Sequence, residues 1–287
     1  MASFSERHGY TEPRSLVQRE SLDDETRVAL WNVVGALPGV FEKLTWDPLR
    51  RDDTSGPGTV AALWAKDFKK PRDEQPSPGT FWALVKAKIL EELWYNVLDL
   101  IEAVSTRLEQ NTTATLNGLP DHFREACNDA FESHLVGYRF IGMELTPVDS
   151  TAEAESITSA LDASDTIGGA RHALDRAVEL LADRQMPDYP NSIKESISAV
   201  EAVVKKVTGE GTLGAGLGKL EGAGLTIHPA LKSAWVKMYG WTSDDDGIRH
   251  GGVEAANADQ ALAKYVLVTS SAFVSYLIEE GRKVGLL

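Results

Sequence analysis

Apolar residues recur every three or four positions along most of the chain, a spacing that places them on one face of a helix. The longest such segment runs from Thr80 to about Glu109, and we expect one long helix there, central to a first domain. Its periodic positions are Phe81, Leu84, Val85, Ile89, Leu93, Val97, Leu100 and Val104.

The segments before it alternate between helices and loops. A helix is expected from Ser21, which is suited to the N-cap because acidic residues follow it, and Pro38-Gly39 should stop this helix. Residues 47–59 and 69–79 are rich in Pro, Gly, Ser and charge, which predicts loops, with a short helix between them. A further helix is expected over residues 119–135.

Period-two alternation appears once, over residues 138–145, with Gly142 in the middle. This pattern predicts a small hairpin or an extended crossing strand. We place a domain boundary near 145–150, with a second junction considered at 185–190. The fold expected is mainly α: a helical N-terminal domain with a small β-hairpin over residues 1–148, then a helical bundle over residues 149–287.

The second half carries clear helix signals. Ser150 with Glu153 predicts a capping box, and the helical pattern breaks at residues 166–169. A helix opened by Asp188 or Asn191 should end at Gly209, with an apolar stripe of Ile193, Ile197, Val200, Val204 and Val207. Later helices should start at Pro229 and at Asn257, the last one ending at Gly281 and burying Leu262, Tyr265, Thr269, Ala272, Phe273, Tyr276 and Leu277.

Composition and charge then narrow the functional classes. The net charge of −14 disfavours non-specific binding to nucleic acid. The charge is uneven, because residues 188–287 hold ten Lys and Arg against 12 Asp and Glu, whereas the rest holds 19 against 31. Any contact with a polyanion is therefore expected in the C-terminal part, through a local patch.

Several kinds of site have no signature in the sequence. The single cysteine, Cys127, excludes an internal disulfide, and its helical spacing favours a buried structural thiol. No histidine pair has the spacing of a metal site on one helix, so we expect neither metal nor cofactor. With no apolar leader and no run of about 18 apolar residues, we expect a cytoplasmic protein without membrane contact.

The stretch "GWTSDDDGIRHGG" gathers the most reactive groups of the chain onto one turn. It holds three acids that begin with Asp244, and Arg249 beside His250. One interpretation is a solvated turn after a helix. The other is a site for metal-free RNA cleavage, in which His250 transfers a proton and Arg249 stabilises the phosphate.

Lys194 and Glu201 share the face of the 191–207 helix that lies opposite its valine stripe. They are either a solvated pair or supporting residues that face the Arg249 turn and shape a pocket. The N-terminal "FSERHGY" has the same two alternatives: a mobile arm, or an arm pinned onto a partner domain by Phe4 and Tyr10.

Several blocks together resemble one family. "FSERHGY", "QRESLDDETRVALWNVV" and "GYRFIGMELTPVDSTAEAESI" resemble the N-terminal domain of AbiJ-type abortive infection proteins. "YPNSIKESISAVEAVVKKVTG" and "YGWTSDDDGIRHGG" resemble their C-terminal domain, which is similar to the HEPN (higher eukaryotes and prokaryotes nucleotide-binding) fold. The resemblance covers nearly the whole chain. It implies antiphage defence by a bundle that dimerises and, in active members, cleaves RNA without metal.

The HEPN-type motif is incomplete in this chain. The resemblance implies an arginine followed by a polar residue, then a histidine about four to six positions after the arginine. With Arg249 as the arginine, the polar residue at the histidine's place is Glu254. With His250 as the histidine instead, the arginine's place falls among Ser243, Asp244 and Asp245, so one half of the pair is missing in either case. We therefore expect either binding of RNA or a nucleotide, with cleavage of RNA through Arg249 and His250 if the site is active, or a non-catalytic adaptor that recognises a phage or host component. A neutraliser of a basic partner is a third alternative.

Overall fold

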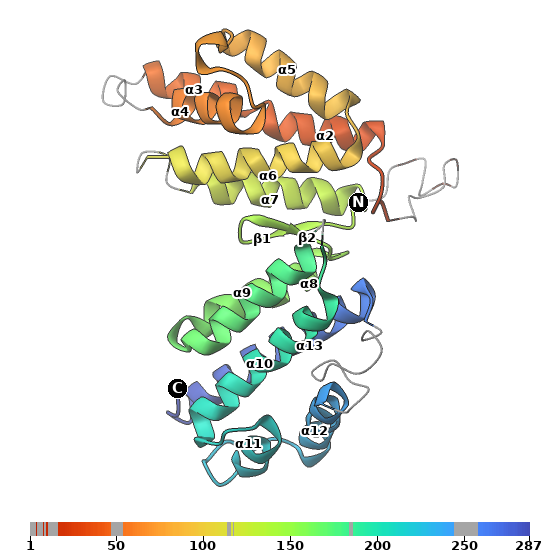
Figure 1. The fold of residues 1–287 in the computed structure, drawn as a ribbon, viewed down its shortest axis with the longest axis vertical. Coiled ribbons are helices and arrows are strands. Elements are labelled where there is room, and N and C mark those ends of the chain that lie inside the picture. The colour runs from red at the N-terminus through yellow and green to blue at the C-terminus, as the bar shows by residue number, and fades with distance from the viewer. Residues whose placement is uncertain are drawn as a thin grey trace. The chain divides into compact units, whose positions relative to one another are not determined.

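The structure is a computed structural model that describes residues 4, 8, 10, 17–46, 54–113, 116, 118–183, 186–243 and 258–287. It is mainly helical with one small antiparallel hairpin, which confirms the expected fold class (Figure 1). The chain divides into two compact units, Met1–Leu145 and Thr146–Leu287, and each is described here by itself.

Unit 1 (Met1–Leu145) is a set of short helices that precede the hairpin. The hairpin strands are β1 (Arg139–Ile141) and β2 (Glu144–Thr146), joined through Gly142 at a positive φ of 59°. The helices and helical turns are α2 (Asp24–Val34), α3 (Leu37–Trp46), α4 (Ser55–Ala62), the π-helical η1 (Leu63–Asp67), the 3-10 turn η2 (Arg72–Glu74), α5 (Pro78–Glu91), α6 (Trp94–Asn111) and α7 (Leu119–Ser133).

The single long helix expected over residues 80–109 is wrong, because the chain forms two helices there. Glu92 and Leu93 adopt extended backbone with ψ of 165° and 144°, and they separate α5 from α6. No Pro or Gly marks this break, so the apolar period runs through it unchanged. Glu92 instead accepts a hydrogen bond from Asn96 at 3.1 Å, and Trp94 at the start of α6 stacks on Tyr138.

Three Pro-Gly pairs stand in the first turns of helices, where the sequence suggested a stop and loops. Pro38-Gly39 opens α3, Pro57-Gly58 lies in the first turn of α4, and Pro78-Gly79 begins α5. Proline fits these positions because the first amides of a helix have no intrahelical acceptor. The cap of α2 is likewise Asp23 rather than Ser21, because its side chain accepts from Thr26 N.

The core of unit 1 is apolar and contains the only cysteine of the chain. Phe81, Phe131 and Ile101 are fully buried in it. Cys127 is fully buried as well, as predicted, and burial alone raises the pKa of its thiol. This thiol is therefore an inert part of the core.

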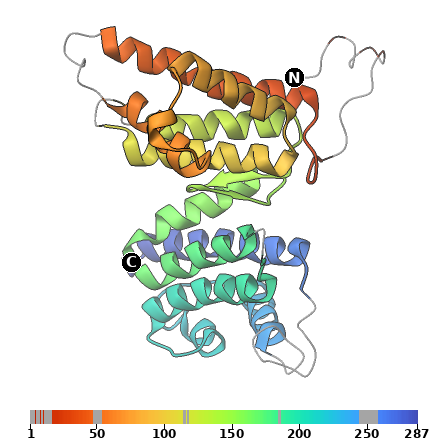
Figure 2. The same cartoon turned by 45° about the horizontal axis from the view of Figure 1, so that its top comes forward.

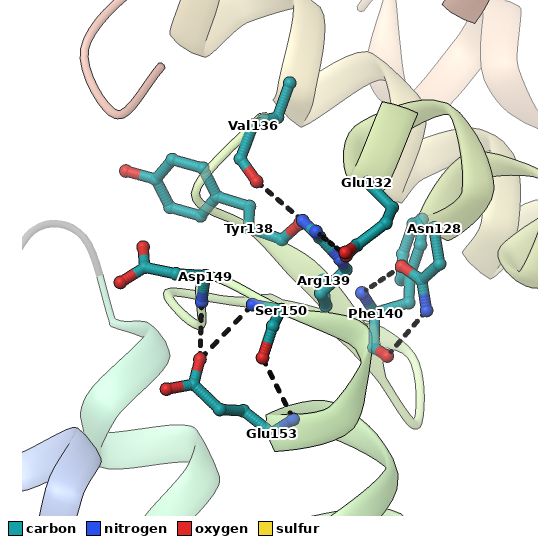
Figure 3. Close-up of polar contacts among 9 residues, drawn as sticks. All are labelled: Asn128, Glu132, Val136, Tyr138, Arg139, Phe140, Asp149, Ser150 and Glu153. Atoms are coloured by element: carbon teal, nitrogen blue, oxygen red, sulfur yellow. Dashed lines mark hydrogen bonds and ion pairs between the residues drawn. The ribbon is translucent and has the colours of Figure 1, made fainter. Parts of the chain in front are cut away.

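A buried arginine ties α7 to the hairpin (Figure 3). Arg139 has no exposed surface, and its Nη1 donates to Val136 O at 2.6 Å and to Tyr138 O at 2.7 Å. Its Nη2 pairs with the carboxylate of Glu132 on α7. All three residues of β1 are buried, so alternation does not reveal the burial of Arg139, and burial of this charge requires the carbonyls and the carboxylate together.

The segment that leads into α2 adds to this region. Gln18 forms a parallel bridge with Val136, and its side chain donates to Thr26 Oγ1 and to His134 O, both at 2.8 Å. Further towards the N-terminus the rings of Phe4 and His8 lie 4.3 Å apart. Pinning of this arm onto a partner domain stays a prediction.

Unit 2 (Thr146–Leu287) is a helical bundle whose main helices lie side by side (Figure 2). The predicted capping box of Ser150 and Glu153 is confirmed, and so are Asp188 as a cap and Gly209, at a φ of 76°, as a helix end. Its elements are α8 (Thr151–Ala163), η4 (Ser164–Thr166), α9 (Gly168–Ala182), α10 (Tyr189–Thr208), α11 (Leu213–Lys219), α12 (Pro229–Ser243) and α13 (Gln260–Lys283).

The last helix differs from its prediction. Asp259 caps it, whereas Asn257 lies outside the described residues. Gly281 lies inside the helix rather than at its end. A Cβ at this position would meet Leu287 Cδ1 at 2.8 Å, so glycine leaves room for the Leu287 side chain. The expected face is also partly wrong: Phe273 and Leu277 are buried, but Tyr265 is exposed.

By length and composition α13 could cross a membrane, contrary to the sequence expectation. Half of its most apolar window is buried inside the protein, and α13 packs against α8, α9 and α10. Burial in the bundle therefore accounts for this apolar composition. Val266, Leu267 and Val274 are among its fully buried residues.

Replacement of Arg139 by alanine should lower the unfolding free energy of unit 1 by about 2–4 kcal/mol, because charged hydrogen bonds to buried carbonyls are lost. Urea titrations followed by circular dichroism would measure this loss. Arg72, which is exposed on η2, offers a control, and Arg72→Ala should leave the midpoint nearly unchanged. Equal midpoints for the two variants would contradict the role given to Arg139.

Candidate functional site

Most of the residues that the sequence proposes as a site lie outside the described part of the chain. These are Asp244, Arg249, His250 and Glu254. The described chain stops at Ser243, the end of α12, and resumes at residue 258, just before α13. Lys194 and Glu201 lie on α10, and α12 and α13 are the helices that precede and follow the stretch outside the described ranges.

The helices α8 and α13 run in the same direction, so both begin at one end of the bundle. Near their starts, Lys264 Nζ lies 2.5 Å from Asp149 Oδ2 and 3.4 Å from Glu153 Oε1. Near their ends, Arg282 donates to Ala163 O at 3.0 Å. Lys264 therefore fixes the first turn of α13, which follows the Arg249 turn, onto the capped start of α8.

The start of α10 lies at the same end. Burial is the larger cause that raises the pKa of Tyr189, the first residue of α10, and the negative charge of Asp259 is the second. Asp259 is the cap of α13, with Oδ1 2.8 Å from Leu262 N. The starts of α8, α10 and α13 thus converge, and we call this region the helix-start end (Asp149, Glu153, Asp188, Tyr189, Asp259 and Lys264).

Glu201 has a structural partner. Its Oε1 accepts a hydrogen bond from Leu213 N at 3.1 Å, so the carboxylate satisfies the first amide of α11. The face of α10 that carries Glu201 therefore looks towards α11. Gly214 of α11 in turn lies against α12, since a Cβ on it would be 3.9 Å from the Tyr239 ring.

Lys194 lies two helical turns closer than Glu201 to the start of α10, on the same face. No ion-pair partner lies within 4.0 Å of its ammonium among the described residues. The helix α12 contacts α13, where Trp235 stacks on Phe273 at 4.2 Å. Asp259, just before α13, lies near enough to Tyr189 for its charge to affect the pKa of that tyrosine. The role of Lys194 as a supporting residue of the site stays a prediction.

The helix-start end carries more acid than base. It holds the carboxylates of Asp149, Glu153, Asp188 and Asp259 against the single cation of Lys264. Lys264 pairs with two of these carboxylates, Asp149 and Glu153.

The described residues provide acid–base groups but no centre for a metal. Among the ranges described, no group of three or more His, Cys, Asp or Glu side chains is placed to hold a metal ion.

Sequence reasoning missed Tyr189 and Lys264. Lys264 meets Asp149 across 115 positions of sequence, so no local spacing reveals the pair. The only sequence signal for Tyr189 was its place directly before Pro190, which predicts that it stands at the start of a helix but not that its side chain is partly buried.

Comparison with known proteins gives one family. A family model described as AbiJ N-terminal domain 4 matches residues 2–163, more than half of the 287 residues. The match covers unit 1 and continues through the hairpin and α8 into unit 2. No curated protein and no solved structure matches the chain. The HEPN-type resemblance of the second half stays a prediction.

If Glu201 serves α11, Glu201→Ala should lower the unfolding free energy of unit 2 by about 1 kcal/mol, the usual effect of losing a helix-start acceptor. Hydrogen exchange should speed up at Leu213 more than at the amides of α13. Lys194→Ala is the matched control on the same face and should leave both quantities unchanged. Slow exchange at Leu213 in Glu201→Ala would argue against the capping role.

The stability of unit 2 should fall above about pH 10, the ordinary pKa of tyrosine. Because the pKa of Tyr189 is raised in the folded state, its contribution is complete below the unfolded pKa and is lost as pH rises through the folded one. Tyr189→Phe should therefore flatten the decline of the melting temperature between pH 9 and 11.5, measured by calorimetry.

Two further variants separate the causes of this shift. Asp259→Asn keeps an acceptor for the cap and removes the charge, so it should flatten the decline in part. Tyr265→Phe changes an exposed tyrosine of the same helix bundle and should follow the wild-type curve. A wild-type slope in Tyr189→Phe would show that Tyr189 plays no part.

Proposed function

The chain belongs to the AbiJ N-terminal domain 4 family, which indicates a role in abortive infection, and on that premise we propose that its C-terminal unit binds RNA through the Arg249 turn. In this proposal the protein acts in the cytoplasm against phage, as a homodimer that places two such turns together. Unit 2 is then a divergent HEPN-like bundle.

One observation supports the location above all. The Arg249 turn joins α12 to α13, and α13 begins where α8 and α10 also begin. A ligand held by the turn would meet the end of a packed bundle in which Lys264 joins α13 to the start of α8. Rigid surroundings of this kind keep reactive side chains in one geometry.

The roles of the residues follow from their chemistry. Arg249 would hold a phosphate through two parallel hydrogen bonds, and Lys194 would add a second positive charge from α10. His250 would act as acid or base if RNA is cleaved, without any metal. Asp244 would orient Arg249, and Glu254 would take the position of the missing second histidine. Glu201 acts only indirectly, by holding α11.

A non-catalytic adaptor is the second candidate, and two specific observations favour it. The turn carries Glu254 where the motif calls for histidine, and the helix-start end is acidic. Both features weaken phosphate chemistry and suit a protein partner from phage or host. In this reading unit 2 dimerises and the N-terminal unit recognises the partner.

The double variant Arg249→Ala,His250→Ala should weaken RNA binding at least about 10-fold, because charge-assisted hydrogen bonds are lost. Fluorescence anisotropy with a labelled single-stranded RNA in EDTA would measure this in the full-length protein. Arg176→Ala removes one exposed arginine from α9 of the same unit and serves as the charge-matched control.

Assays in infected cells distinguish the two candidates. RNA binding predicts that the double variant loses both protection against phage and growth arrest, with the fold intact by circular dichroism. Wild-type protection by the double variant, with no RNA cleavage, would support the adaptor and reject the RNA site. A monomer by light scattering at micromolar concentration would remove the paired-turn arrangement.

A further inference from the structure

A cavity of about 550 Å³ lies within unit 1, lined by residues of α3, α4 and α5 together with the stretch before α5 (helices placed in Figure 1). Its volume falls in the range of roughly 300–1,000 Å³ that is usual for small-molecule sites. Phe41, Val60 and Trp82 give it apolar and aromatic walls. None of these residues belongs to the site proposed on unit 2.

The starts of two helices also form part of the wall. Gly56 in the first turn of α4 and Gly79 in the first turn of α5 line the cavity, and a glycine can line it only with backbone. Amides in a first turn have no intrahelical acceptor. Thr54, the cap residue of α4, makes no side-chain hydrogen bond to them. Pro57 and Pro78 have no N–H and Ser77 Oγ accepts from Thr80 N, so the donors left on this wall are the amides of Gly56 and Gly79.

Trp82 supplies a second and independent donor. It is nine-tenths buried, with 7% of its surface exposed, yet its indole N–H has no acceptor among the described residues. The neighbouring Trp64 shows the usual arrangement, since its N–H donates to Pro71 O at 2.6 Å. Because this nitrogen is neither hydrogen-bonded nor fully enclosed, it keeps its donor available, and Trp82 is one of the residues that line the cavity.

Acceptors are present on the same wall. Glu42 brings a carboxylate and Gln75 an amide that can both donate and accept. The negative charge of Glu42 disfavours a small anion, and a purely apolar ligand would leave the N–H of Trp82 unpaired. A ligand that uses the whole wall must be flat and must carry both acceptors and donors on its edge.

We propose that this cavity binds a planar nitrogen heterocycle of the nucleobase type. Its ring would pack on Phe41 and Trp82, its acceptors would receive the indole and helix-start amides, and its donors would meet Glu42 and Gln75. The proposal goes beyond the RNA site because it concerns unit 1 alone and involves neither Arg249 nor Lys194.

Calorimetric titration of the full-length protein with adenosine tests this. We expect saturable binding with a Kd at or below about 1 mM. Purine riboside, which lacks the exocyclic amine, should bind more weakly because it cannot donate from that position. Trp82→Phe keeps an aromatic wall and removes the N–H, so it should weaken adenosine binding about 5-fold. Trp94→Phe is the same change at a ring stacked on Tyr138 and should leave the affinity unchanged.

A variant that fills the cavity tests whether adenosine binds there, independently of the hydrogen bond from Trp82. No atom lies within 4 Å of a Cβ built on Gly79, so Gly79→Phe can fold and put its ring at the cavity. It should weaken adenosine binding at least 10-fold, while circular dichroism and the melting temperature report that the fold is kept.

The results separate the alternatives clearly. Absence of saturable binding to the wild type would overturn the proposal, and so would equal affinity in the wild type and both cavity variants. Binding of toluene without binding of adenosine would show a plain apolar pocket and would overturn the heterocycle. Arg249→Ala,His250→Ala should bind adenosine normally, so failure of the RNA site leaves this test unaffected.

Discussion

The first amides of a helix lack acceptors inside the helix, and the way this chain satisfies them organises both units. In unit 2 the acceptors are acidic or hydroxyl side chains: Ser150 for α8, Asp188 for α10 and Asp259 for α13, with Glu201 added at α11. Because α8, α10 and α13 start together, these caps gather negative charge at one end of the bundle. In unit 1 the Asp23 and Ser77 side chains cap α2 and α5, whereas Thr54 at α4 gives no side-chain hydrogen bond, and Gly56 and Gly79 line a cavity.

The acidic caps of unit 2 bear on the choice between the two proposed functions, RNA binding and recognition of a protein partner. A cap is most effective when it is an oxygen acceptor, yet an acidic cap repels the phosphate that an Arg249 turn would attract. Lys264 neutralises part of this charge but is held by Asp149 and Glu153. The same residues that make the end of the bundle rigid thus make RNA binding depend on few cations. Recognition of a basic protein surface would face no such opposition.

Much of the fold could be predicted from sequence because its signals are local. The capping box at Ser150, the end at Gly209 and the mainly helical class follow from residues only a few positions apart. The break before Leu93 could not, since its apolar period continues through two extended residues. The burial of Arg139 and the pairing of Lys264 depend on partners brought by tertiary structure, which spacing does not encode. The candidate site stays a prediction, since most of its residues lie outside the described ranges.

The buried thiol of Cys127 has a practical meaning for a protein of two units. As the only cysteine in the chain, and with no exposed surface, it can react with an alkylating reagent only after α7 detaches from the core. The rate at which Cys127 is labelled therefore measures how often unit 1 opens, and unit 2 contributes nothing to that signal. A ligand that stabilises the folded state of unit 1 would lower the labelling rate of Cys127. One chemical reaction can thus follow the opening of the N-terminal unit inside the intact chain.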